Sequence, residues 1–137
     1  MWDRKELISA REIQGEITQE TVKFAEKFGE YLAKDDEKMG YKPLTTSQLR
    51  RFFGEVKRQQ LLGYDSTKFV MLKPKLAYAV GRAKQSNKGY NKIEDFYYVL
   101  ANAIDLVEQA PDKKKAFQNF ITAFEAIVAY HKAWEKK

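Results

Sequence analysis

The sequence contains no cysteine and only one histidine, His131. Without cysteine there are no disulfides or thiolate metal sites, and a single imidazole is too little for a histidine-based metal site or a serine–histidine pair. No apolar run approaches the roughly 18 to 20 residues that cross a bilayer, and the first residues have no apolar stretch typical of a secretory signal. We therefore expect a cytoplasmic protein with no cofactor, no metal and no membrane contact.

Proline is also scarce, since Pro43, Pro74 and Pro111 are the only three in the chain. A proline costs about 3 kcal/mol in a helix interior but is accepted in the first turn of a helix. Pro43 and Pro111 therefore predict helix boundaries, and Pro74 predicts either a helix start or a kink.

Regularly spaced apolar residues are abundant. The 137 residues are 44% hydrophobic and 14% aromatic, which suffices for one core. Apolar residues recur every three and four positions, and alternation with period two is absent beyond a few residues, so the fold class is predicted to be all-α. We expect one domain over residues 1–137, a compact bundle of about five helices, in which residues 1–14 are the candidates for poor order.

The apolar spacing and its interruptions predict five helical ranges. They are 17–38, 46–62, a third that begins between residues 66 and 74 and ends near 85, 92–109, and a last one that begins at Pro111 and Asp112. Thr45 and Gln48 match the capping box that starts a helix, and Asn91 with Glu94 resembles a second cap. The segment 86–91, with the sequence SNKGYN, is the best candidate for a mobile loop.

Positive charge is concentrated in the middle of the chain. Residues 41–92 contain 12 Lys and Arg against two acids, Glu55 and Asp65, whereas residues 1–40 contain 7 cations and 10 acids and residues 93–137 contain 6 cations and 7 acids. The central block therefore has a net charge of +10 (12 − 2), and the two flanks sum to −4. Such segregation indicates a polyanionic partner, because its field extends toward a nucleic acid or an acidic surface.

Helical projection places many of these cations outside the core. In 46–62 the predicted buried face consists of Leu49, Phe52, Phe53, Val56 and Gln60. Arg50 and Lys57 lie together at one side of this face, and Arg51 and Arg58 lie nearly opposite it. Gly54 lies between the two pairs, so the centre of the cationic face has almost no side chain and another backbone could approach it.

The next helix shows a related pattern, in which an aromatic residue lies among cations. Its predicted inward residues are Leu76, Ala79, Val80 and Ala83, and Lys75, Tyr78 and Arg82 share its outer face. Nucleic-acid sites combine cations for phosphates with aromatic rings on which bases stack. Lys73, Lys84, Lys88 and Lys92 would extend the charge toward segment 86–91.

Ordinary explanations exist for each of these residues taken alone. Any one cation can belong to a solvated helix surface, and Tyr78 can equally pack at a helix seam. His131 lies in the apolar stripe of the last helix, from Phe117 to Trp134, and is expected in the core or at a seam. Lys113, Lys114 and Lys115 are expected to be solvent charges. The concentration of cations, rather than a single residue, is the unusual feature.

Three segments resemble the small subunit of type III-A CRISPR effector complexes, the Csm complexes. They are LTTSQLRRFFGEV, KPKLAYAVGR about 25 residues later, and FEAIVAYHK, in this order within residues 44–132. The resemblance implies a non-catalytic helical bundle, several copies of which stack inside a ribonucleoprotein beside its backbone and large subunits. It further implies contacts with the backbones of guide RNA and target RNA.

Carried onto this sequence, the resemblance and the helical projections point to one set of RNA-binding residues. The set is Arg50, Arg51, Lys57, Arg58, Lys75, Tyr78 and Arg82. Two alternatives stay open: a helix-turn-helix DNA-binding protein that uses the helices around LLGYDS, and an assembly module whose basic face docks on acidic proteins. An enzyme is the weakest interpretation, because acids such as Asp105 and Glu125 have no neighbouring catalytic group in the sequence pattern.

Overall fold

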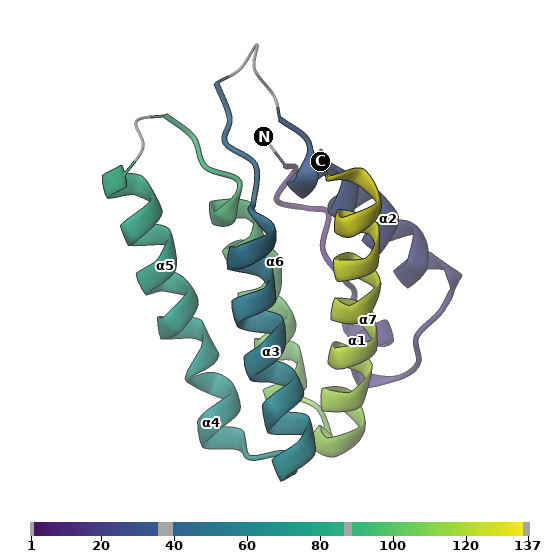
Figure 1. The fold of residues 1–137 in the computed structure, drawn as a ribbon. Coiled ribbons are helices and arrows are strands. Elements are labelled where there is room, and N and C mark those ends of the chain that lie inside the picture. The colour runs from purple at the N-terminus through teal and green to yellow at the C-terminus, as the bar shows by residue number, and fades with distance from the viewer. Residues whose placement is uncertain (1, 36–39, 87–88, 136–137) are drawn as a thin grey trace.

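The computed structural model describes residues 2–35, 40–86 and 89–135, which form an all-α bundle (Figure 1). Five helices have 15 or more residues: α2 (Gln19–Ala33), α3 (Thr46–Leu62), α5 (Leu72–Ser86), α6 (Ile93–Glu108) and α7 (Lys113–Trp134). Two helices of five residues, α1 (Ala10–Gln14) and α4 (Ser66–Val70), complete the described parts. Within these parts there is no strand, and the prediction of an all-α bundle is confirmed.

The helix after α3 does not start at Pro74. The chain forms α4 first, ends it with Met71 as the C-cap residue and continues as α5, so Pro74 is the third residue of α5. Proline has no amide hydrogen, and the first turn of a helix is where that hydrogen has no intrahelical acceptor. The break therefore precedes the proline, which fits into the first turn.

The predicted start of α3 is confirmed in detail. The Thr45 hydroxyl accepts a hydrogen bond from the Gln48 amide at 3.1 Å, and the Gln48 side chain accepts one from the Thr45 amide at 2.9 Å. At α6 the helix begins one residue later than predicted, at Ile93. Asn91 still contributes, because its side-chain oxygen accepts from the Ile93 amide at 3.0 Å while Glu94 accepts from the Asn91 amide at 3.4 Å.

The core lies between α2, α6 and α7, with α3 closing it on one side (Figure 1). Most of the predicted stripe of α7 is buried, and His131 is buried with its Nε2 2.7 Å from the Leu44 carbonyl oxygen. Trp134 departs from the prediction because its side chain is exposed, with the Lys34 ammonium 4.7 Å from its ring. In α3 the buried glutamine is Gln59 rather than the predicted Gln60.

The described part of residues 1–14 contributes to this core. Trp2, Ile8 and Ile13 are buried, and the Trp2 ring lies 4.7 Å from the Phe28 ring. Ser9 caps α1 through a capping box with Glu12. This segment therefore covers one side of α2.

Backbone hydrogen bonds to Lys42 hold the C-terminal end of segment 86–91. Asn87 and Lys88 lie outside the described residues, as does Lys38, the predicted end of the first long helix. Lys42 donates to the Tyr90 carbonyl and accepts from the Lys92 amide, both at 2.9 Å, in a short parallel bridge. The start of α6 is thus fixed beside the residues that lead into α3.

Candidate nucleic-acid interface

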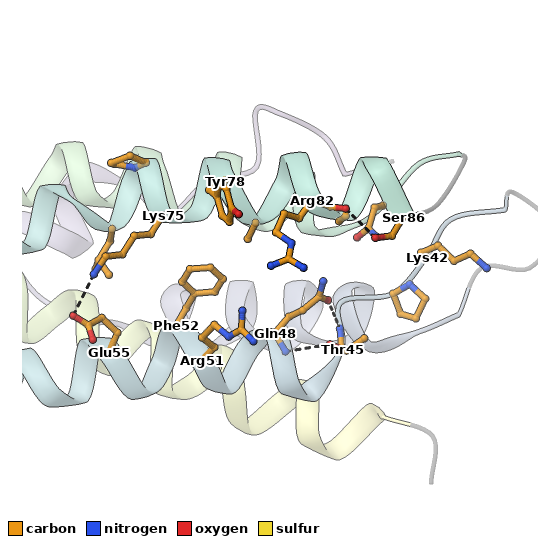
Figure 2. Close-up of a pocket in the computed structure, with 16 residues that line it drawn as sticks. Lys42, Thr45, Gln48, Arg51, Phe52, Glu55, Lys75, Tyr78, Arg82 and Ser86 are labelled. Atoms are coloured by element: carbon orange, nitrogen blue, oxygen red, sulfur yellow. Dashed lines mark hydrogen bonds and ion pairs between the residues drawn. The ribbon is translucent and has the colours of Figure 1, made fainter.

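A groove of about 830 Å³ separates α3 from α5 (Figure 2). Helix α5 packs mainly on α6, and the groove lies between α5 and α3. Four of the seven predicted site residues line it: Arg51, Lys75, Tyr78 and Arg82. We call this feature the α3–α5 groove.

Two arginines face each other across the α3–α5 groove. Figure 2 shows the side chain of Arg51 rising from α3 and that of Arg82 descending from α5 toward it. Both residues are exposed, and neither forms an ion pair with any residue in the described ranges. Two like charges that approach without an acid between them repel each other, so an anion placed between them would be stabilised.

Tyr78 and Phe52 supply the aromatic part of the groove. Tyr78 projects from α5 with 69% of its surface exposed, whereas Phe52 is 7% exposed and lies at the base of the groove. The rest of the base is made of small or buried apolar residues such as Ala79 and Leu72. The groove therefore presents one accessible aromatic ring above a closed apolar surface.

Glu55 is the acid among the groove-lining residues, and its charge is already neutralised. Arg58 donates two hydrogen bonds to its carboxylate, at 3.1 and 3.2 Å, and the Lys75 ammonium lies 3.7 Å away. The bonds from Arg58 hold the pKa of Glu55 below its usual range, against a smaller opposing effect of burial and with help from Gln59 and Lys75. The carboxylate thus stays ionised and positions Lys75 at one end of the groove.

The structure leaves the other predicted cations of α3 outside the groove. Lys57 faces α7, where its ammonium lies 2.9 Å from Glu125. Arg50 is exposed and does not line the groove; its charge adds, after the hydrogen bond and charge of Lys132 and the charge of His131, to a lowered pKa of Glu135. Arg58 is occupied by Glu55. The predicted set therefore divides into a groove group and an outer group.

Three lysines do not extend the charge as predicted. Lys73 and Lys84 pair with acids of α6, at 2.7 Å from Asp105 and 3.1 Å from Glu94. Lys92 is 2% exposed and donates to the backbone carbonyls of Tyr31 and Lys34. Lys88 lies outside the described residues. The charge of the central block is therefore presented mainly along the groove and the outer face of α3.

Lys42 is a groove residue that sequence reasoning missed. It precedes Pro43 outside any helix, and it reaches the groove because of its backbone bridge to residues 90–92. Its membership in the cationic block was the available signal, but projection of single helices cannot place a residue of a connecting segment.

The cations of the groove suit an anionic ligand. In the described ranges, no group of three or more His, Cys, Asp or Glu side chains could hold a metal ion. The same ranges contain no helix long and apolar enough to cross a membrane.

Comparison with known proteins gives the family. A family model described as Csm2 Type III-A matches residues 15–137. Searches among curated proteins and among solved structures return no significant match. The matched range covers nearly the whole chain and includes all three segments on which the resemblance was based. The chain therefore belongs to the Csm2 Type III-A family, the small subunits of type III-A Csm complexes.

Proposed function

We propose that this small subunit binds RNA without catalysing its cleavage. The observation that supports the proposal best is the pair Arg51 and Arg82, which face each other across the α3–α5 groove with no acidic partner among the described residues. Lys42 and Lys75 continue the positive charge toward its two ends. Contacts of this kind neutralise phosphates and position a strand without reading its bases.

The natural ligands in this proposal are the guide RNA and target RNA of a cytoplasmic ribonucleoprotein for antiviral defence. The outer cations of this chain (Arg50, Lys57 and Arg58) and its exposed apolar residues would contact the backbone and large subunits of the complex and neighbouring copies of the chain. Leu61 and Leu62 at the end of α3, and Met71 after α4, are exposed and suit such protein contacts. The helix-turn-helix alternative gains no support from α4, whose five residues are too few for a recognition helix that spans a groove of DNA.

The test is the affinity of the full chain for two RNAs of unrelated sequence. Replacing Arg51 and Arg82 together with glutamine should weaken binding of both RNAs equally, by about tenfold or more for each arginine. The matched control is the double variant K114Q/K115Q, which removes the same charge from exposed positions at the start of α7.

Equal losses in the groove variant and in the control would show that only net charge matters and would contradict a defined binding surface. A strong preference for one of the two sequences would contradict recognition through phosphates.

A further inference from the structure

The shape of the α3–α5 groove bears on whether its ligand is duplex RNA or an unpaired strand. In a duplex the bases are paired and stacked inside, so the outside offers phosphates and shallow groove edges. The groove lies between two helices, and its volume of about 830 Å³ is within the usual 300 to 1,000 Å³ of small-ligand pockets. A volume of this size suits an unpaired nucleotide rather than a whole duplex.

The ring of Tyr78 is the main aromatic surface that an entering group would meet. It is 69% exposed and lines the groove from α5, whereas residues at the base, Phe52 and Leu72, are 7% and 2% exposed. An amphipathic protein helix could bury its stripe on the apolar base, but it would also have to be strongly acidic to match the cations that line the groove. A nucleobase needs only one flat face, because every base can stack on an aromatic ring.

The charges lie where the phosphates of such a nucleotide would be. Arg51 and Arg82 flank the groove on its two sides near Tyr78, and Lys42 and Lys75 lie toward its ends. Arginine donates planar pairs of hydrogen bonds that suit phosphate oxygens. The single lining carboxylate, Glu55, is neutralised by Arg58 and Lys75, so it does not repel an anion strongly.

We propose that the α3–α5 groove binds an unpaired segment of RNA, with one base stacked on Tyr78 and its phosphates between Arg51 and Arg82. This inference rests on the proposed function and adds a structural requirement to it. The groove would hold a strand where pairing is interrupted, while a duplex would meet only the cations at the rim of the groove.

The test uses the full chain and an oligouridine about eight nucleotides long, within the range of single-strand sites, with a central 2-aminopurine. Stacking on Tyr78 should quench the fluorescence of this base. Y78A should abolish the quenching and lower the affinity about 5- to 150-fold, whereas Y78F should retain both because the ring remains. Y98A is the matched control, since Tyr98 is a partly exposed tyrosine of α6 and does not line the groove.

Two further ligands distinguish the failure of the inference from that of the proposed function. An abasic strand of the same length should bind more weakly than the oligouridine, and a duplex of the same length should bind without requiring Tyr78. If the oligouridine and the duplex bind but the abasic strand binds as tightly as the oligouridine, the inference is wrong and the proposed function stands. If none of the three RNAs binds, the inference and the proposed function are both wrong. Binding of an acidic helical peptide at the groove would then assign the groove to a protein partner.

Discussion

The buried carboxylate of Asp95 joins three parts of the chain. It is fully buried and accepts hydrogen bonds of 2.6 Å from the hydroxyls of Tyr31 in α2 and Tyr90 before α6. Arg4 of the N-terminal segment approaches it to 3.7 Å. Because both tyrosine hydroxyls depend on the same acceptor, its loss would leave two polar groups without their partner.

We therefore predict that D95A lowers the free energy of unfolding by about 3 to 5 kcal/mol, because it leaves two hydroxyls without their acceptor, at about 1 to 3 kcal/mol each. Y31F should cost only about 1 kcal/mol, because it removes one hydrogen bond and leaves the carboxylate bound to Tyr90 and Arg4. Urea-induced unfolding of the two variants measures the difference. Equal small effects would contradict a shared buried acceptor.

The same tyrosines predict an alkaline limit to stability. Burial, followed by hydrogen bonding to Asp95, raises the pKa of Tyr31 and Tyr90 above the usual range, and burial with donation to Glu108 raises the pKa of Tyr64 to about 12. The folded chain thus keeps these protons when the unfolded chain loses them, so stability is retained below pH about 10 and falls as the pH rises further.

Ultraviolet titration of tyrosinate, followed together with circular dichroism, checks this limit. The chain has eight tyrosines, and we expect these three to ionise only as the helices unfold. Ionisation of all eight near pH 10 in a chain that remains helical would contradict the structure.

Individual buried polar residues were beyond sequence analysis. Gln59 and Gln60 lie about 100° apart on the helix, and the projection placed only Gln60 on the buried face. In the structure Gln59 is buried because its amide donates to the Lys68 carbonyl of α4 at 3.2 Å. Lys92 likewise is a core residue because two carbonyls of the α2 end accept from its ammonium. Both assignments depend on partners that are distant in sequence.

Helices α2 and α7 approach closely at Gly29. A Cβ atom at this position would lie 2.8 Å from the Tyr130 Cβ and 2.9 Å from the His131 backbone nitrogen. We predict that G29A lowers the free energy of unfolding by about 1 to 3 kcal/mol, because overpacking forces the two helices apart. Thermal unfolding of the variant and of the wild-type chain provides the measurement.

Gly54 of α3 gives the matched comparison for a helical glycine. A Cβ atom there meets nothing within 4 Å, so G54A should stabilise the isolated chain by up to about 1 kcal/mol through helix propensity. If a phosphate chain or a protein backbone approaches this position, the same change should weaken that association. Unchanged binding of both kinds of partner would remove the suggested reason for a glycine there.

Helix positions were more predictable than helix interruptions. The bounds of α3 agree with the sequence because a capping box and Gly63 mark its two ends. The break at Met71 has no such local signal, since it arises from the packing of Phe69 and Leu72 into the core on either side of it.

For the whole molecule, sequence analysis identified the cationic block but not its final distribution. The projections placed Arg51, Lys75, Tyr78 and Arg82 outside the core, and the fold brings these four around one groove. Ion pairs then remove other members, since acids of the flanking helices α6 and α7 lie beside Lys73, Lys84 and Lys57. Charge counted along a sequence therefore overstates the charge that a ligand meets.

RNA affinity measured as a function of salt concentration tests whether these groove cations meet phosphates. If the four cations of the groove, Lys42, Arg51, Lys75 and Arg82, each neutralise one phosphate, log affinity should fall with log salt at a slope of about −3. The slope of R51Q/R82Q should be shallower by about 1.5, and that of K114Q/K115Q should be unchanged. A flat response of the wild-type chain, or the same change of slope in both double variants, would contradict RNA binding at the α3–α5 groove.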